Sequence, residues 1–431
     1  MIPLGKVGYS SVAITPSVGS RMGGYSGRVY SKGVHDDLYA RALYVSDSKR
    51  GILLISTDLV GFFHMTPIRI RKLISRRTGF PYDAIFVHAI HNHAGFDTMG
   101  IFDTGGMFFK RTLEFDKLIE IEKKIALAGI KALKEAKNAK VAFASTFPDK
   151  KIAIDRRKPD RLVKYPINVI KFEREDTDIY LVNYAMHATV LPRTNYLFSA
   201  DYPGYLVRWF EERGYKAIYV NGPCGNVNPY LLKKEIDLMS LPKDIREKLI
   251  YEYPGTFEDA KRIGFYLAEK AYNAVKDVEA EEISYVNYKR LDLRLPLDYW
   301  SAKKSVSSKL FHDFLINLIL TIKRLGLGNW VYSDMHFKGG SRFVNTEIIG
   351  ARINDIYLGG LPAEFFVEYY DKIKRLSEIE KLILIELTND SLGYVPNPED
   401  LGEGGYEETL CFVPAFAKYG PQLISRLLKN L

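Results

Sequence analysis

The segment that most constrains this chain is residues 87–100, VHAIHNHAGFDTMG, which holds three of the eight histidines. An apolar, strand-like run over residues 83–90 leads into it, so the histidines fall where a strand enters a loop. Side chains two positions apart on a strand point to the same side, so His91 and His93 converge if the extended conformation reaches them. Such a pair can give a metal ion two ligands from one short segment, and the alternative is two ordinary polar histidines on a loop.

Strand-like and helix-like segments alternate along the chain. The short apolar runs at residues 51–56 and 382–387 are typical of strands that are buried on both faces. Residues 115–136 have apolar positions at helical spacing, with acidic residues early and lysines late, as a helix dipole favours. This alternation predicts an α/β fold with a mixed β-sheet core flanked by helices. The length alone suggests two or three domains, although large α/β folds often form one long unit.

The second half of the sequence also predicts helices and strands, although its apolar residues are less regularly spaced. Residues 348–358 are expected to form one strand, and a Gly-Gly-Leu-Pro-Ala-Glu turn then leads into a helix from Phe365. Residues 310–325 predict an apolar helix that could wall an acyl-chain pocket with nearby aromatic residues, or belong to the ordinary core. Two more segments predict helices: 233–278 and 420–431.

The composition narrows the classes of partner. The net charge of +9 and the isoelectric point of about 9.1 favour anionic partners. We find no basic run of five residues and no nucleic-acid-binding motif, so nucleic acid is not an expected partner. The longest apolar run, residues 314–322, is far shorter than the roughly 20 residues that span a bilayer, which predicts no transmembrane segment.

The cysteine and glutamine counts bear on the environment. Only Cys224 and Cys411 are present, and the first residues lack the apolar stretch of a signal peptide, so we expect a reduced, cytoplasmic setting. Gln422 is the only glutamine, while charged residues are plentiful. This bias resembles proteins from hot environments, in which thermolabile amides are rare, and predicts a thermophilic protein.

Polar residues with metal-ligand chemistry follow predicted strands at four places. Ligands of open α/β sheets bind at the carboxyl ends of strands, so we expect the metal site there. Two histidines, one carboxylate and one further oxygen suit zinc with an open position, and iron or manganese also accepts such a set. Each residue has an ordinary alternative, such as a structural histidine or a glutamate favoured by a helix dipole. The residues are His91 with His93, His187, Glu364 and Tyr394.

Eight blocks of the sequence occur in the same order in one known family. They are GYSSVAITP at 8–16, GVHDDLYARAL at 33–43, HNHAGFDT at 91–98, NYAMHATVL at 183–191, SADYPGY at 199–205, NGPCGNVNP at 221–229, LPAEF at 361–365 and GYVPNPEDLGEGGYE at 393–407. With these blocks the chain resembles the catalytic domain of the neutral/alkaline (non-lysosomal) ceramidase family. The resemblance extends from residue 8 to about residue 420, almost the whole sequence.

The resemblance implies one zinc ion per chain, held by His91, His187, Glu364 and Tyr394. It places His93 beside the metal, where an imidazole could donate to a developing oxyanion or move a proton, with Tyr394 as a second donor. It also implies a single catalytic domain over residues 1–431, for which we expect neither the family's C-terminal immunoglobulin-like domain nor its secretion signal.

The same blocks point to four further residues. Arg156 matches a family position near the pocket and could contact a substrate carbonyl. Asp201 could orient His187, or it could cap the helix that follows. Asn228 stands where characterised ceramidases carry a serine nucleophile, a role that an amide side chain cannot fill. Cys224 lies in the same turn and could attack instead, or it is a small buried cysteine.

The resemblance therefore implies a zinc-dependent hydrolase that cleaves the amide (C–N) bond of a small-molecule N-acyl or lipid-like substrate. Because Asn228 replaces the serine, we expect attack by metal-activated water and no covalent intermediate. Two alternatives stay open. One is a metal-stabilised protein that binds an N-acyl or lipid-like ligand without turnover, and the other is an esterase or lactonase.

Overall fold

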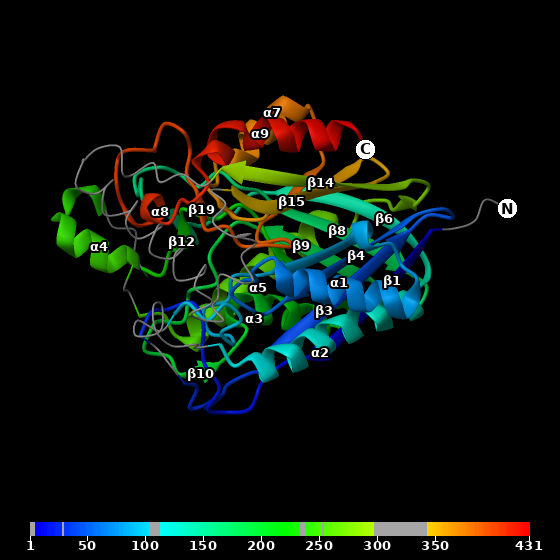
Figure 1. Ribbon diagram of the computed structural model, residues 1–431, viewed down its shortest axis with the longest axis horizontal. Coiled ribbons are helices and arrows are strands. Elements are labelled where there is room, and N and C mark those ends of the chain that lie inside the picture. The colour runs from blue at the N-terminus through cyan, green and yellow to red at the C-terminus, as the bar shows by residue number, and fades with distance from the viewer. Residues whose placement is uncertain (1–4, 28–29, 103–112, 233–237, 252–253, 297–342) are drawn as a thin grey trace.

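The computed structural model of the protein describes residues 5–27, 30–102, 113–232, 238–251, 254–296 and 343–431. Two β-sheets pack face to face, and helices cover the outer face of each, so the layers run helix, sheet, sheet, helix (Figure 1). The predicted α/β class with a mixed sheet core flanked by helices is thus confirmed. The predicted helix at residues 310–325 and the aromatic residues Tyr299, Trp300, Trp330 and Phe337 lie outside the described residues.

The larger sheet has nine strands in the order β11-β9-β8-β6-β1-β3-β4-β5, with β13 paired to β6. Strand β4 runs parallel to β5 and β9 runs parallel to β11, whereas the other pairs are antiparallel. The strands are β1 (Lys6–Ala13), β3 (Tyr39–Ser46), β4 (Gly51–Thr57), β5 (Ile85–Ala89), β6 (Lys137–Thr146), β8 (Ile167–Arg174), β9 (Ile179–Tyr184), β11 (Lys216–Asn221) and β13 (Glu281–Glu282).

The smaller sheet has the order β14-β15-β16-β18, formed by β14 (Val286–Pro296), β15 (Phe343–Ile353), β16 (Ile356–Gly360) and β18 (Leu382–Ile385). The prediction of one strand over residues 348–358 was wrong. Asn354 adopts a left-handed conformation with φ of 50°, which turns the chain back so that β15 and β16 form an antiparallel hairpin. Asparagine tolerates this conformation better than most residues, so the reversal falls at that position.

Aliphatic side chains fill the space between the two sheets. Leu54 of β4 and Phe86 of β5 belong to one buried cluster with Ile349 of β15 and Ile385 of β18. The alternate residues of β4 point the other way and pack under the outer helices, as Leu53 does. Every residue of β4 is therefore buried, which explains its unbroken apolar sequence.

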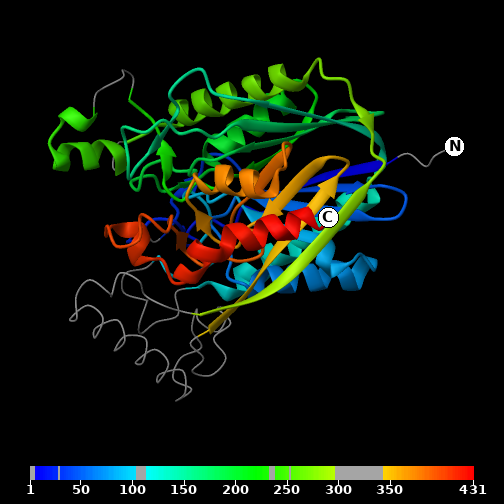
Figure 2. The same ribbon diagram turned by 90° about the horizontal axis from the view of Figure 1, so that it is seen from above.

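Helices cover both outer faces. In Figure 2, α7 (Tyr369–Ser377) and α9 (Pro414–Lys429) lie over the smaller sheet. The larger sheet is covered by α1 (Met65–Thr78), α2 (Phe115–Lys134), α3 (Asp201–Glu211) and α5 (Phe257–Val275). The short elements are η1 (Tyr82–Ala84), η2 (Leu238–Ser240), α4 (Lys243–Tyr251) and α8 (Tyr406–Thr409). Within the described ranges, no helix combines the length and apolar character needed to span a membrane.

Three predicted helix boundaries need correction. The helix expected from Phe365 begins at Tyr369, because β17 (Glu364–Phe365) pairs with β19 (Tyr394–Val395). The helical region predicted over 233–278 contains the separate helices α4 and α5, and a capping box between Thr256 and Asp259 starts the second. The terminal helix begins at Pro414 rather than at residue 420, with proline in its first turn, where no N–H is needed.

Three two-stranded ladders join the loops at one end of the sheets. They are β2 (Gly33–Val34) with β10 (Leu197–Phe198), β7 (Ala153–Asp155) with β12 (Val227–Pro229), and β17 with β19. In Figure 1, β12, β19, α8 and α4 all lie at the end of the molecule opposite the N-terminus. Loops that follow several strands are thereby tied together at that end.

Candidate metal centre

His91, His187 and Glu364 converge from three separate elements. His91 follows β5, His187 follows β9, and Glu364 is the first residue of β17. One ligand atom from each lies within 4.8 Å of the others, and all three residues are buried. Oε2 of Glu364 is 3.1 Å from Nε2 of His91 and 3.3 Å from Nε2 of His187. The structure thus brings together three of the four residues predicted as metal ligands around one point.

His91 and His93 meet through a turn and not through a continuing strand. The extended conformation expected as far as His93 ends at His91, which has a left-handed φ of 61°. The imidazole Nδ1 of His91 lies 2.8 Å from the carbonyl of Val60, so this nitrogen carries a proton and Nε2 faces the cluster. Nε2 of His93 is 3.2 Å from Nε2 of His91. Both rings therefore reach the centre as predicted, by a different backbone path.

Asn92 anchors this turn, and the sequence analysis missed it. Its side chain is wholly buried and donates to the carbonyls of Asp58 and Ser199, at 3.0 and 2.7 Å. It also accepts a 2.8 Å hydrogen bond from the backbone N–H of Ala94, two residues on, which closes an Asx turn. An asparagine directly after a strand is a recognisable turn signal, so this residue could have been found.

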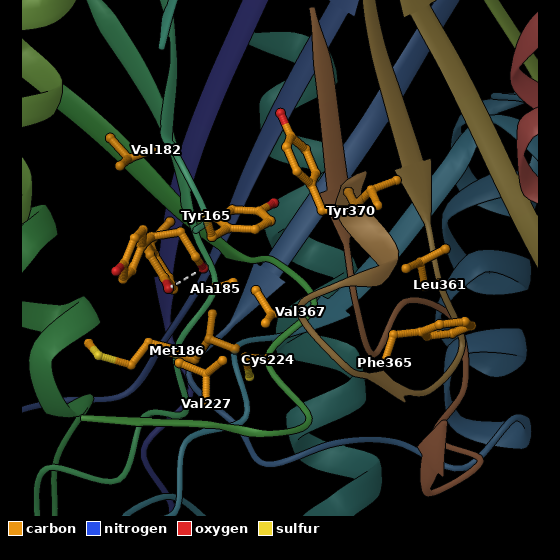
Figure 3. Packing of buried hydrophobic residues seen from close by; sticks show 14 of the residues in the cluster. Tyr165, Val182, Ala185, Met186, Cys224, Val227, Leu361, Phe365, Val367 and Tyr370 are labelled. Atoms are coloured by element: carbon orange, nitrogen blue, oxygen red, sulfur yellow. Dashed lines mark hydrogen bonds between the residues drawn. The ribbon is translucent and has the colours of Figure 1, made fainter. Parts of the chain in front are cut away.

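The ring of His187 is oriented by the turn at residues 221–229. Both its backbone N–H and its Nδ1 lie 3.0 Å from the carbonyl of Val227, which leaves Nε2 for the cluster. Figure 3 shows Val227 and Cys224 packed beside Ala185 and Met186 at the end of β9. The turn that holds Nδ1 of His187 is therefore itself fixed by apolar packing.

Burial and mutual charge set the protonation of the three residues. Burial lowers the pKa of His187 to about 4, helped by the positive charge of Arg156, so its imidazole is neutral. Burial also acts to lower the pKa of His91, but the carboxylate of Glu364 outweighs it and the pKa is raised. Burial alone would raise the pKa of Glu364, yet the two histidines hold it well below its ordinary value. The glutamate is therefore ionised, which is the form that binds a metal.

The donor set fits a divalent metal ion. Nε2 of His187 and Oε2 of Glu364 are buried and make no well-directed hydrogen bond among the described residues. Buried polar atoms without a partner are costly, and an ion between them would satisfy both. Two imidazoles and one carboxylate suit zinc, iron or manganese and leave a position open for substrate.

Tyr394 is held next to Glu364 by the pairing of β19 with β17, in which the two residues are directly opposite. Its ring is buried, and burial together with the charge of Glu364 raises the pKa of the phenol well above its ordinary value. The ring centroid lies 5.4 Å from the guanidinium of Arg156 and 5.7 Å from the ring of Tyr406. The phenol is therefore a neutral donor at the edge of the cluster.

Arg156 is held in place by hydrogen bonds to several described residues. Its Nε donates to Glu407 at 2.7 Å, Nη1 to Oδ1 of Asn228 at 3.1 Å and Nη2 to the carbonyl of Gly225 at 2.7 Å. Glu407, which was not predicted from the sequence, is only 1% exposed and also pairs with Arg157 at 3.2 Å. Arg156 and Asn228, both predicted near the site, are thus brought together, and Glu407 fixes them.

The hydrogen bonds of Asp201 do not reach His187. Its carboxylate accepts from the backbone N–H groups of Leu191 and Tyr202, at 2.9 and 2.6 Å. Asp201 was expected to orient His187, but Nδ1 of His187 faces the carbonyl of Val227 instead. Asp201, with φ of 53°, therefore ties the loop after His187 to the start of α3.

Solved structures with a similar fold are known. Neither the protein-family models nor the curated protein sequences match this chain. The crystal structure of neutral ceramidase from Pseudomonas aeruginosa is similar, with a TM-score of 0.75 and 18% identity over 99% of this chain and 74% of that one. A ceramidase complexed with C2 is similar at a TM-score of 0.73 and 16% identity, over 99% of this chain and 75% of that one. This chain has a neutral ceramidase-like fold. At that level the resemblance found in the sequence is confirmed.

Within this ceramidase-like fold, Cys224 is not an activated nucleophile. Its side chain is completely buried, and burial together with Glu386 raises the pKa of the thiol well above its ordinary value. Sγ donates to Oε1 of Glu386 at 2.8 Å and lies 3.3 Å from Nδ1 of His187. Glu386 was also missed from the sequence, where it ends the apolar run of β18. Burial raises the pKa of this acid to about 8, so it is protonated at neutral pH.

The glycine-rich segment before β2 reaches the centre at Gly24. This residue has φ of 90°, and a Cβ added there would lie 2.4 Å from Cγ of His93. The ring of Tyr25 meets the ring of His93 edge-on, with centroids 4.8 Å apart. The close approach of this backbone therefore fixes the position of His93.

Replacing Gly24 with alanine is expected to displace His93 while the metal ligands stay in place. We expect hydrolysis to fall by roughly 10- to 100-fold, since a shift of about 1 Å in a reacting group has effects of that size. Gly19→Ala is the matched control, because Gly19 has a similar φ of 86° with nothing within 4 Å of the added Cβ. Initial rates and metal content of the two variants provide the measurement. Equal rates in the two variants would show that contact with His93 is irrelevant.

Proposed function

We propose that this protein is a zinc-dependent hydrolase that cleaves the amide bond of an N-acyl or lipid-like substrate. The observation that carries the proposal is the buried cluster of His91, His187 and Glu364, in which Nε2 of His187 and Oε2 of Glu364 make no well-directed hydrogen bond among the described residues. The similar solved structures are ceramidases, and ceramide is an N-acyl amide. The fold and the donor set therefore favour the same class of reaction.

Each residue has a definite task in this proposal. His91, His187, Glu364 and Tyr394 would hold the ion, which when bound polarises the substrate carbonyl and lowers the pKa of a water towards about 7. Nε2 of His93 lies 3.2 Å from Nε2 of His91, and the protonated imidazole of His93 would donate a hydrogen bond to the carbonyl oxygen as negative charge develops there. The neutral phenol of Tyr394 is a second donor on the same side as Glu364.

Water is the proposed nucleophile. Oδ1 of Asn228 accepts from Arg156, and Nδ2 of Asn228 donates to the carbonyl of Ile250 at 3.1 Å, so this amide has a bracing role. The thiol of Cys224 is protonated and donates a hydrogen bond to Glu386. His93 can take a proton from the attacking water and return it to the leaving amine, as general acid–base catalysis requires.

Direct attack by water predicts that no acyl-enzyme accumulates. We expect the intact mass of the protein to be unchanged when a reaction with a long-chain amide is stopped in acid during turnover. Intact-protein mass spectrometry gives the answer, with an unreacted sample as the control. A mass increase equal to one acyl group would contradict the water mechanism and would locate a nucleophile in the chain.

Metal content and turnover test the proposed function as a whole. Protein purified without added metal is expected to hold about one zinc ion per chain, and a chelator is expected to abolish amide hydrolysis until zinc is restored. Bound metal without turnover of amides or esters would instead favour a ligand-binding protein, the alternative that the missing serine suggests. Faster turnover of a matched ester than of the amide would favour an esterase.

A further inference from the structure

A cavity of about 400 Å³ is lined by two residues, Arg156 and Tyr406, that also lie near Tyr394. Arg156 lies in its wall, and the same side chain contacts Asn228 and stacks near Tyr394. Tyr406 also lines the cavity, with its ring centroid 5.7 Å from that of Tyr394. Tyr394 is directly opposite Glu364 in the β17–β19 pair, so Arg156 and Tyr406 link the wall of the cavity to the residues around the cluster.

The walls of this cavity are predominantly basic. Five lining residues are cationic and three are acidic. Glu407 neutralises part of the charge, since it accepts from Arg156 at 2.7 Å and from Arg157 at 3.2 Å. Lys158 forms an ion pair with Asp400. These three cations are therefore largely engaged in holding the loop around Glu407.

Arg246 of α4 differs from those cations. It is half-buried and lines the cavity. Among the described parts of the chain no carboxylate lies within ion-pair distance of it, and its Nη1 donates a weak hydrogen bond to Sδ of Met239 at 3.5 Å. The other α4 cation in the wall, Lys243, is exposed and lies 3.7 Å from Glu247, a separation at which surface pairs contribute little. Arg246 thus offers an uncompensated guanidinium to whatever enters.

We propose that this cavity binds a carboxylate on the amine side of the substrate, so that the enzyme hydrolyses N-acyl amino acids or closely similar N-acyl amides. The proposal rests on the proposed hydrolysis of an amide. Water is added across the C–N bond, the acyl chain leaves as a carboxylic acid, and the other product is an amine that carries its own carboxylate. No oxidant, reductant or further reactant is required.

The chemistry of the walls favours this class over a neutral lipid. A guanidinium binds a carboxylate with two parallel hydrogen bonds, which an alcohol head group cannot match. A volume of about 400 Å³ holds a small polar group, whereas charged walls disfavour an acyl chain. The net charge of +9 also raises the encounter rate with anionic substrates.

The experiment compares N-lauroylglycine with N-lauroylethanolamine, which differs mainly in lacking the carboxylate. We expect the wild-type protein to favour N-lauroylglycine by at least about 10-fold in kcat/KM, the size of one charged hydrogen bond. Arg246→Gln is expected to reduce this preference by about 10-fold, chiefly through KM. Lys248→Gln is the control, because Lys248 is on the same helix and does not line the cavity.

The outcomes separate this inference from the proposed function. Turnover of both amides without preference, or a preference that Arg246→Gln leaves intact, would overturn the carboxylate site while the hydrolase stands. If neither amide is hydrolysed, the hydrolase fails, and calorimetric binding of the two amides still tests the cavity. Tighter binding of N-lauroylglycine that is lost in Arg246→Gln supports the site, and equal binding of both amides overturns it.

Discussion

Replacing Glu364 with glutamine is expected to empty the candidate metal centre and to stop hydrolysis. The change preserves the volume of the side chain but removes the carboxylate that His91 and His187 both face, at 3.1 and 3.3 Å. Changes outside the ligand set of metal enzymes already lower affinity or activity by about 10- to 100-fold, so a larger loss is expected for a ligand. We expect zinc to fall from about one per chain to traces, and kcat/KM to fall by more than about 100-fold.

Plasma mass spectrometry of the purified variant and initial rates with zinc in excess measure the two effects. Glu120→Gln is a matched control, because Glu120 is exposed on α2 and pairs with Lys124 at 2.8 Å, with no contact to the centre. The control is expected to keep its zinc and its rate, and the melting temperatures of both variants show whether the fold is intact. A folded Glu364→Gln protein with full zinc content and full activity would place the metal elsewhere.

Two of the ligand candidates, His91 and His187, could be predicted because each one follows an apolar strand that the sequence shows clearly. His91 comes after β5 and His187 after β9, and both strands are buried throughout. The prediction lacked the turn at His91, whose φ of 61° accompanies the buried hydrogen bonds of Asn92. A continuing strand was expected to bring His91 and His93 together, whereas a turn at His91 does so.

Two of the missed residues, Glu407 and Glu386, are acids whose burial depends on distant partners. Glu407 is 251 positions from Arg156 in the sequence, and nothing near it distinguishes it from a surface glutamate in a glycine-rich loop. Glu386 ends a strand as many exposed acids do, yet it lies under Cys224, 162 positions away. The local sequence pattern predicts helices and strands and where they end. The two-stranded ladders that bring residues such as Glu407 together pair segments that are far apart in the sequence, so a local pattern does not predict them.

The largest loss of stability is expected for Glu347→Gln, in a charge network away from the metal centre. Glu347 of β15 is 1% exposed and pairs with Arg71 of α1, whose side chain is completely buried. Nη2 of Arg71 donates to Oε2 at 2.9 Å, and Nη1 of Arg290 in β14 lies 3.0 Å from the same oxygen. The variant would leave the guanidinium of Arg71 buried without its counter-charge, which costs about 3–5 kcal/mol of unfolding free energy.

The pH dependence of this effect follows from the pKa of Glu347. Burial acts to raise it, but Arg71 and Arg290 outweigh burial and hold the pKa below its ordinary value of 4.5. A depressed pKa means that the stabilisation is complete above that value and is lost as the pH falls through the lower folded-state pKa. The difference in unfolding free energy between wild type and variant should therefore be full at pH 7 and shrink only in acid below pH 4.5.

Denaturant unfolding at pH 7 and in acid measures this difference, with Glu282→Gln as the control. Glu282 pairs with Lys140 at 3.5 Å on an exposed surface, so its replacement is expected to change stability by less than about 1 kcal/mol. A loss at Glu347 no larger than the loss at Glu282 would mean that Arg71 finds another partner or water. Because the network joins α1 to both β14 and β15, a large loss would show that it holds the outer helix layer to the smaller sheet.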